Sequence, residues 1–155
     1  MTPSRPSGLR IRSAQDVDLG RLVHLLELGA LAGGKEQPTD LRPYAAALSE
    51  IGRGPGDVLV AEMHAEVVGL CQLIVFRHLQ AGGGRCAEIE SVHVHPDHRG
   101  RGIGRRLMEE AIGRARAAGC YRVQLTSNLA RPEAHRFYLA LGFEASHRGF
   151  KLALP

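Results

Sequence analysis

The segment Arg99-Gly100-Arg101-Gly102-Ile103-Gly104 (residues 99–104) is the most informative part of this sequence. It follows residues 92–96, where Val and His alternate up to a proline as at the end of a strand, and it opens an amphipathic helix. A glycine-rich turn between strand and helix presents backbone N–H groups and the positive end of the helix dipole to an anion. Glycines also let the backbone approach a bulky anion, because they have no Cβ. We therefore predict a phosphate-binding loop, with a solvent-exposed arginine-rich turn as the alternative.

The remaining sequence predicts a mixed α/β fold in which this helix crosses over between neighbouring strands. Helical spacing of apolar residues is clearest from Ile103 to Ala118, and Gly119 predicts the end of that helix. Residues 1–8 are expected to form a flexible tail and residues 9–155 a single domain. The predicted strands are 9–12, 58–62, 67–75, 86–94, 121–126 and 143–154, and the predicted helices are 17–28, 41–51, 103–118 and 132–141.

Composition and charge favour a cytoplasmic protein. The net charge of +4 is mild and compatible with an anionic ligand. The three cysteines Cys71, Cys86 and Cys120 are odd in number and widely spaced, which indicates buried free thiols in a reducing compartment. No signal peptide and no apolar run of about 20 residues is present, so no membrane contact is expected.

Two common phosphate-binding motifs do not fit the loop. A dinucleotide-binding G-x-G-x-x-G needs a third glycine, but Leu107 stands at that position. A nucleotide triphosphatase loop needs a Lys after its glycines, and the only lysines are Lys35 and Lys151. The sequence therefore disfavours a dinucleotide oxidoreductase and an NTPase.

A third pattern, R-x-x-G-x-G, does fit and is made by Arg99, Gly102 and Gly104 after Val94-His95-Pro96. Downstream, residues 134–138 read A-x-x-F-Y and residues 141–143 read L-G-F. Together these segments resemble the acyl-CoA-binding and C-terminal motifs of the GNAT superfamily of N-acyltransferases. The resemblance implies an α/β (α+β) fold with a mixed, mostly antiparallel central sheet of about six to seven strands flanked by about four helices.

The resemblance implies an acetyl-CoA-dependent N-acetyltransferase that transfers an acetyl group directly, through a tetrahedral intermediate, to the primary amine of a small molecule. Ile89-Glu90-Ser91-Val92 and residues 119–123 look most like members that acetylate small amines, amino-sugar phosphates among them. The alternatives are an acetyltransferase for protein N-termini or lysines and a non-catalytic acyl-CoA-binding module. A homodimer that pairs C-terminal strands would fit the family.

Candidate acetyl-CoA-binding groups follow from the same resemblance. The pyrophosphate would meet the N–H groups from Gly100 to Arg105, with the side chains of Arg99, Arg101 and Arg105 as further candidates. The segment Val92-His93-Val94 would lie along the pantetheine arm through its backbone, and one N–H group there would meet the thioester oxygen. Many members carry Asn seven residues before the helical Tyr, where this sequence has Arg131, so Asn128 is the polar candidate for that role.

Two carboxylates are candidates for the base that deprotonates the amine. Strict alternation places Glu88 and Glu90 on the face shared by Val92 and Val94, which implies a bulge or an active-site cavity. An amine of the lysine type has a pKa of about 10, so it needs a base at neutral pH. We favour Glu90, which is nearer the loop; a carboxylate paired with an arginine on the sheet face is the alternative.

Tyr138 is the candidate acid that protonates the departing thiolate, and it would also touch the cofactor. A phenol with a pKa of about 10 can donate a hydrogen bond to sulfur. The alternative is a packing aromatic whose hydroxyl group is satisfied elsewhere.

Three histidines, His93, His95 and His98, form the one tempting metal pattern in the sequence. Because His98 lies beyond Pro96 in a turn, we expect no metal site. His93 or His95 could instead face the acceptor as an auxiliary base. The arginine–glycine segment is too short and too poor in aromatics for an RNA-binding tract, so no nucleic-acid partner is expected.

Overall fold

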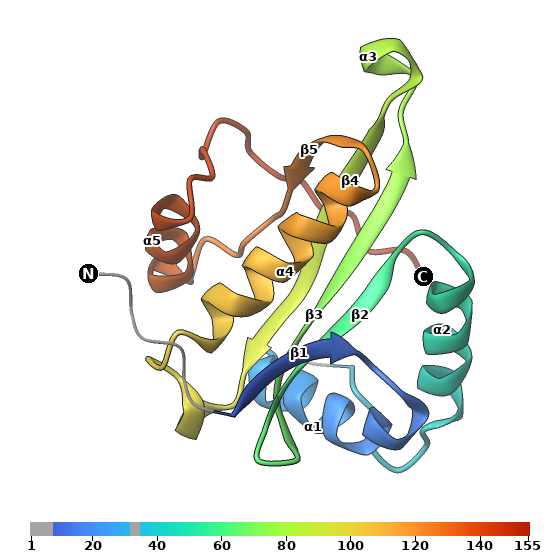
Figure 1. The fold of residues 1–155 in the computed structure, drawn as a ribbon, viewed down its shortest axis with the longest axis vertical. Coiled ribbons are helices and arrows are strands. Elements are labelled where there is room, and N and C mark those ends of the chain that lie inside the picture. Colours follow the sequence, from blue (N-terminus) through green and yellow to red (C-terminus); the bar gives the residue numbers. More distant parts are fainter. Residues whose placement is uncertain (1–7, 32–34) are drawn as a thin grey trace. The chain divides into compact units, whose positions relative to one another are not determined.

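The computed structural model describes residues 8–31 and 35–155 (Figure 1). Residues 1–7 of the expected N-terminal tail lie outside the described part. The chain divides into two compact units, the first ending at Gln124 and the second comprising Leu125–Pro155. That residues 9–155 act as one domain stays a prediction.

The first unit contains a five-stranded sheet in the order β1-β2-β3-β4-β5. The first three pairings are antiparallel, whereas β4 and β5 are parallel because α4 connects them. The mixed, mostly antiparallel sheet is therefore confirmed. The strands are β1 Leu9–Ser13, β2 Asp57–Met63, β3 Glu66–Arg77, β4 Arg85–Val94 and β5 Cys120–Gln124.

Four of the described helices, α1, α2, α4 and α5, lie where the periodic segments predict them, whereas the short α3 was not predicted. The first unit has α1 Leu19–Gly29, α2 Arg42–Arg53, the short α3 Gln80–Gly83 and α4 Ile103–Ala117, with 3₁₀ turns η1 Asp16–Asp18 and η2 Pro96–His98. The second unit has α5 Pro132–Ala140. No strand is present among residues 125–155, so the extended segment expected from residue 143 adds nothing to the sheet, which is smaller than the six to seven strands expected.

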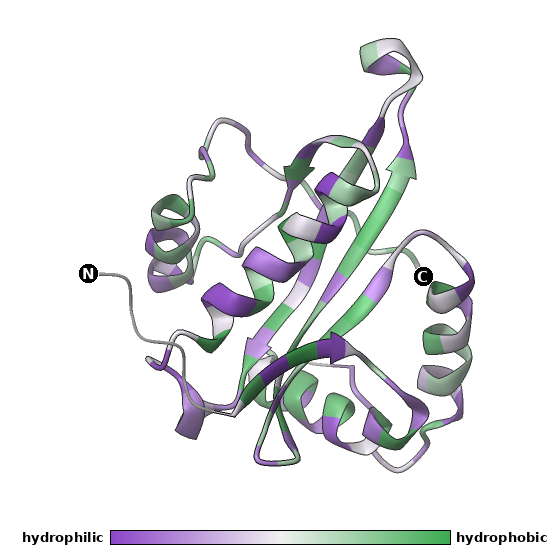
Figure 2. Cartoon of the chain, in the orientation of Figure 1, coloured by the Kyte–Doolittle hydropathy of each residue, from purple (hydrophilic) through white to green (hydrophobic). Residues whose placement is uncertain are grey.

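The two faces of the sheet are covered by different helices. On one face, Ile103, Leu107, Ala111 and Ala115 recur every four residues and form the buried side of α4. An added Cβ at Gly69 of β3 would lie 3.2 Å from Leu107, so this glycine lets α4 approach the sheet. The neighbouring residue, Leu70, packs on the other face with buried side chains of α1. Figure 2 shows the apolar stretches of β2 and β3 between these layers.

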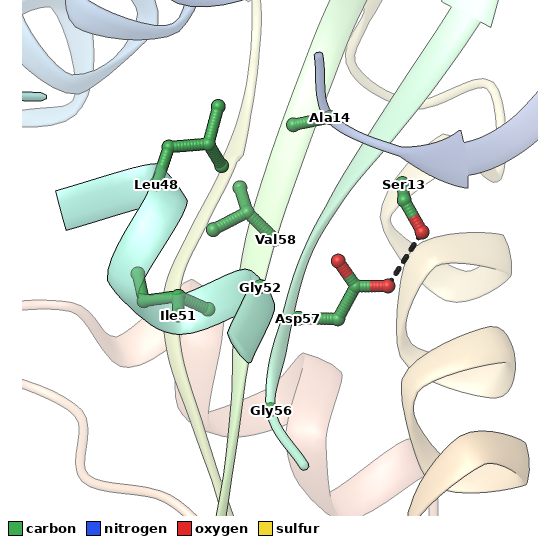
Figure 3. Close-up of a pocket in the computed structure, with 8 residues that line it drawn as sticks. All are labelled: Ser13, Ala14, Leu48, Ile51, Gly52, Gly56, Asp57 and Val58. Atoms are coloured by element: carbon green, nitrogen blue, oxygen red, sulfur yellow. Dashed lines mark hydrogen bonds between the residues drawn. The ribbon is translucent and has the colours of Figure 1, made fainter. Parts of the chain in front are cut away.

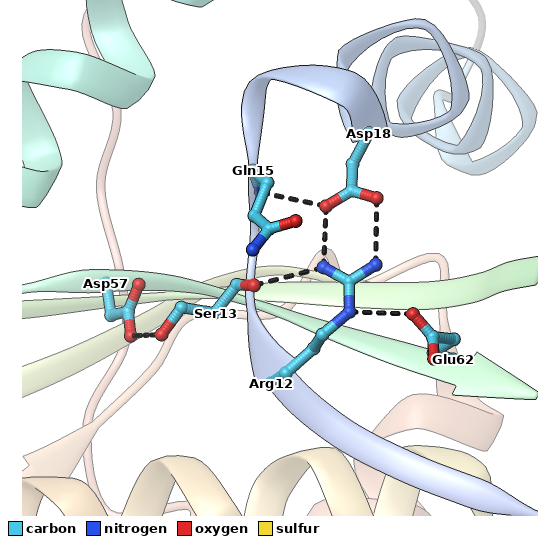
Figure 4. A network of polar contacts seen from close by, with 6 residues as sticks. All are labelled: Arg12, Ser13, Gln15, Asp18, Asp57 and Glu62. Atoms are coloured by element: carbon cyan, nitrogen blue, oxygen red, sulfur yellow. Dashed lines mark hydrogen bonds and ion pairs between the residues drawn. The ribbon is translucent and has the colours of Figure 1, made fainter. Parts of the chain in front are cut away.

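A buried ion pair fixes the entry to α1 (Figure 4). Arg12 of β1 donates two hydrogen bonds to the carboxylate of Asp18, at 2.7 and 2.9 Å, and one of 2.7 Å to Glu62 of β2. The N–H group of Gln15 donates a further bond to Asp18, whose side chain is 6% exposed. The bonds from Arg12 are the main cause that lowers the pKa of Asp18, while burial opposes the shift.

Replacing Asp18 with Asn should lower the free energy of unfolding by about 2–3 kcal/mol at pH 7, because Arg12 would lose its two-bond partner inside the fold. Since the folded pKa of Asp18 is lowered, its contribution is present above the ordinary carboxyl pKa and is lost as pH falls through the folded value. Urea unfolding at pH 7 and pH 3 checks both points. The gap between wild type and variant should narrow at pH 3; a gap of the same size at both pH values would contradict the assignment.

Candidate active site

The predicted phosphate loop lies between β4 and α4. Gly100 and Gly102 have φ of +73° and +77°, a left-handed conformation that disfavours side chains. Arg99 donates from Nε to the carbonyl oxygen of Val94 at 3.0 Å, so this arginine ties the loop to the end of β4. An added Cβ at either glycine would meet no described atom within 4 Å. The loop is thus a tight turn whose backbone is open to a ligand.

The first turn of α4 supplies backbone donors beside this loop. Gly102 is the N-cap and has no side chain that could satisfy them. The N–H groups of the first turn have no carbonyl one turn earlier in the helix to bond with. Ile103 is 1% exposed and anchors the helix start in the core. Of the candidate arginine side chains, Arg101 is exposed and Arg105 is half-buried.

Strand β4 contains a bulge three residues before its end. Leu70 pairs with His93 and Gln72 with Glu90, so Ser91 and Val92 together oppose the single residue Cys71. Ser91 has φ of +52°, which is unusual for a residue with a side chain. The predicted bulge is therefore confirmed.

The bulge corrects one prediction about side chains. Leu70 and Gln72 point to the same face of β3, and directly paired residues share a face, so Glu90 and His93 lie together. Val94 pairs with Gly69 and points to the opposite, α4-covered face. Strict alternation had placed the carboxylates with Val94; this was wrong because the extra residue shifts the alternation by one.

The sheet opens beside the same part of β4. Strand β5 pairs with β4 only from Arg85 to Glu88, so residues 89–94 have no strand on that side in the described chain. The N–H group of His95 donates to Val68 of β3 at 2.8 Å, and backbone direction alternates along a strand. The backbone groups of Val94 therefore point to the open side. Because the Val94 carbonyl accepts from Arg99, its N–H group is the donor that remains for a ligand there.

The two candidate bases differ in their surroundings. Glu88 accepts a 3.0 Å hydrogen bond from the amide of Gln124 in β5. Glu90 lies directly opposite Gln72 and next to the bulge. Gln72 is half-buried and was not predicted; its signal is a lone amide inside the apolar run of β3. Glu90 is thus the carboxylate that lies within the open stretch of β4, whereas Glu88 lies in the part paired with β5.

The histidines pack locally and do not cluster around a metal position. His95 Nδ1 accepts from the N–H group of Asp97 at 3.3 Å and caps η2. The ring centre of His95 lies 5.8 Å from that of His98 and 6.4 Å from that of His24 in α1. The buried Nδ1 atom of His98 has no hydrogen-bond partner among the described residues. Within the described part of the chain, no three His, Cys, Asp or Glu side chains come together as metal ligands.

Asn128 and Tyr138 belong to the second unit and are described within it. The side chain of Asn128 accepts from the N–H group of Ala130 at 2.8 Å, which forms a turn before α5. The ring of Tyr138 meets those of Phe137 and Phe143 edge to face, at 5.2 and 6.0 Å between centres. The Tyr138 carbonyl accepts from the N–H group of Phe143 at 3.1 Å, which fixes the end of α5. The ring of Tyr138 thus packs between two aromatic side chains of the same unit.

A cavity of about 300 Å³ lies away from these residues (Figure 3). It is lined by Leu48, Ile51 and Gly52 of α2 and by residues 13, 14 and 56–58. Its polar side is Asp57, which accepts a 2.6 Å bond from Ser13 and pairs with Arg114 of α4. Since none of the predicted site residues lines it and its carboxylate is already paired, the cavity adds no chemistry to the site.

The chain is similar in sequence to two named N-acetyltransferases. It is 32% identical over 149 residues to a glucosamine 6-phosphate N-acetyltransferase of Trypanosoma brucei brucei, with 94% of this chain and 96% of that protein matched. It is 39% identical over 95 residues to an aminoalkylphosphonate N-acetyltransferase of Salmonella typhimurium, and that match spans 61% of each protein.

Solved structures share the fold. A Bacillus halodurans C-125 protein described as a transcriptional regulator has a TM-score of 0.88 and 38% identity, covering 94% of this chain and 99% of that one. An acetyltransferase of Trypanosoma brucei has a TM-score of 0.77 and 28% identity, with the same coverage. The Acetyltransferase (GNAT) family model matches residues 23–143, most of the chain. The chain therefore belongs to the GNAT family and is an N-acetyltransferase with the family's α+β fold.

Proposed function

We propose that this N-acetyltransferase transfers the acetyl group of acetyl-CoA to the primary amine of a small molecule that also carries an anionic group. The observation that carries the proposal is the open stretch of β4, residues 89–94, which contains the bulge and leads to the glycine loop. Two relatives have names that join an amine to a phosphate or phosphonate. GNAT enzymes use an acyl-CoA cosubstrate, which supplies the acetyl group as a thioester.

The residues present fit an acyl-CoA. The left-handed glycines leave open space at the start of α4, where N–H groups and arginines favour a pyrophosphate. The Arg101 and Arg105 side chains would add charge, while Arg99 holds the loop against Val94. In the proposal, the Val94 N–H group and the backbone of Val92 bind the pantetheine arm. His93 belongs to the same stretch, but its backbone is directed to β3, as that of His95 is. Asn128 contributes a polar group from the second unit.

The proposed chemistry needs a base and an acid on this chain. Glu90 takes a proton from the acceptor ammonium, directly or through water, which frees the nitrogen lone pair for attack on the acetyl carbon. A backbone N–H group of the bulged segment stabilises the negative oxygen of the tetrahedral intermediate. Tyr138 gives a proton to the departing thiolate as the carbon–sulfur bond breaks, and the second proton that the amide nitrogen loses restores the Tyr138 hydroxyl group, directly or through water.

The free cysteines support direct transfer rather than an acetylated cysteine. Cys71 and Cys86 are fully buried, and burial raises the pKa of the Cys71 thiol to about 12. Cys120 pairs with Arg85 at the far end of β4 from the loop. At about 3.3 Å per residue, the six residue steps from Arg85 to Ser91 put it about 20 Å from the bulge.

Thiol release from acetyl-CoA across amines, amino-sugar phosphates, aminoalkylphosphonates and peptide N-termini tests the proposal. Turnover of small anionic amines is expected, with slower turnover of their uncharged analogues. CoA should also raise the melting temperature, because a ligand that binds the folded state stabilises it. Turnover of peptides alone would favour the protein-modifying alternative, and stabilisation by CoA with no turnover would favour a binding module.

Gly102→Ala should weaken CoA binding by about five- to tenfold. A Cβ at this position strains the left-handed backbone conformation by about 1 kcal/mol, and relief of that strain would tilt the backbone N–H groups in the first turn of α4. Gly113→Ala is the matched control in the same helix, because its Cβ would meet no described atom within 4 Å. Calorimetric titration with CoA should show unchanged affinity for this control. Equal affinities of the two variants would remove the loop from the CoA site.

Two further proposals concern the whole molecule. We propose a homodimer that uses the C-terminal segment, where Phe150, Leu152 and Leu154 alternate and are exposed. The molar mass from light scattering tests this state.

We propose a cytoplasmic location because the three cysteines are unpaired. None of the helices within residues 8–31 and 35–155 has the length and hydropathy to cross a bilayer.

A further inference from the structure

The last residue of α1 meets the side chain of His93. A Cβ added at Gly29 would lie 1.9 Å from Nδ1 of His93, 2.2 Å from Cε1 and 2.8 Å from Cγ. All three distances are shorter than real Cβ contacts allow. The imidazole ring therefore occupies the space that any side chain at position 29 would need.

Space, and not backbone conformation, is the reason for a glycine at this position. Gly29 is absent from the residues with positive φ, so an L side chain is compatible with its backbone. Alanine is a better helix former than glycine, so helix propensity alone would favour a side chain here. The glycine is therefore explained by the ring of His93.

The end of α1 has little freedom to move away from this ring. Leu22 and Leu25 are buried in the core beneath the helix. Arg21 donates to the carbonyl oxygen of Val67 in β3 at 2.8 Å and forms an ion pair with Glu66 at 2.6 Å. These contacts hold the body of α1 against the sheet, so we expect a side chain at Gly29 to displace the ring of His93.

His93 shares its face of β4 with Glu90, and the bulge lies between them. This face carries the base of the proposed reaction, so the acceptor amine must come to it. We propose that Gly29 is a positioning residue that holds the His93 imidazole on the acceptor side of β4, where the ring helps to bind the acceptor. This inference rests on the proposed function.

Four variants test this proposal: Gly29→Ala, His93→Ala, the double variant, and Gly20→Ala as control. Gly20 lies in the same helix, and a Cβ there would meet no described atom within 4 Å. Gly29→Ala should lower kcat/KM for the acceptor about tenfold, the loss expected when one hydrogen bond is broken. Gly29→Ala should leave KM for acetyl-CoA unchanged. General destabilisation would not lower kcat/KM for the acceptor while leaving KM for acetyl-CoA the same.

The double variant separates positioning from a general structural role. Once His93 is Ala, Gly29→Ala should have no further effect on kcat/KM, because the two changes act through one contact. The effect of Gly29→Ala on the melting temperature should also change sign. The substitution should lower the melting temperature when His93 is present, and should raise it by about 2 °C in the His93→Ala background, because alanine is the better helix former. If Gly29→Ala causes the same losses in both backgrounds, the proposal is wrong.

NMR spectroscopy of the His93 ring tests its positioning by Gly29 independently of the proposed function. If the wild-type protein acetylates no amine, the proposed function fails, and the acceptor role of His93 fails with it. The ring-proton NMR signals of His93, assigned by their absence in His93→Ala, still test the positioning. They should shift in Gly29→Ala and stay in place in Gly20→Ala; signals that move in neither variant overturn the proposal.

Discussion

Replacing Tyr138 with Phe is expected to lower kcat by about 10²-fold, the lower part of the range for loss of a general acid. The ring would keep its contacts with Phe137 and Phe143, so the second unit should keep its local packing. Only the hydroxyl group is lost, and with it the proton for the departing thiolate. Since the glycine loop and β4 supply most of the proposed contacts with acetyl-CoA, its affinity should change little.

Tyr121→Phe is the matched control for this substitution. Its hydroxyl group contacts His78 at 2.9 Å, and it lies on β5 near the start of β4, at the opposite end from the loop. Stopped-flow measurement of thiol release, with CoA affinity from calorimetry, checks both variants. A Tyr138→Phe enzyme with the kcat of wild type would remove Tyr138 from the mechanism.

Replacing Glu90 with Gln is expected to lower kcat/KM for the amine by about 10²-fold at pH 7, because the neutral amide cannot take the proton of an ammonium group. The loss should shrink as pH rises toward the amine pKa of about 10, since the acceptor then arrives already deprotonated. A pH profile of both proteins measures this. Gln has the shape of Glu, so packing against Gln72 across the strand pair is preserved.

Glu88→Gln is the control for the carboxylate. Glu88 accepts a hydrogen bond from Gln124, and its replacement should lower activity by less than about threefold. A loss at Glu90 that stays constant from pH 7 to pH 10 would indicate that this residue orients the acceptor and is not the base. A larger loss at Glu88 than at Glu90 would reverse the assignment.

Local interactions explain why much of the fold could be predicted. Apolar residues repeat along α4 at helical spacing because one face of a helix must be buried, and that repeat is visible in the sequence. Gly100 and Gly102 mark the left-handed turn because other residues are strained there. The prediction of a strand after residue 143 was wrong because a strand also depends on residues far away in the chain. Phe150 and Leu152 show the alternation of a strand, but they are exposed and no described strand pairs with this segment.

The order of the main helices and strands up to residue 140, the glycine turn before α4 and membership of the GNAT family could be predicted from the sequence, since each depends on neighbouring residues or on a motif. Which residues share a sheet face with Glu90 could be seen only in the tertiary structure. The one extra residue of β4 in its pairing with β3 puts His93 on the same face as Glu90 and puts Val94 on the opposite face. The tertiary structure also decided that Gly29 leaves room for His93 and that Asp18 is buried against Arg12. These contacts join residues far apart in the chain, and their pairing depends on register and packing, which no local pattern encodes.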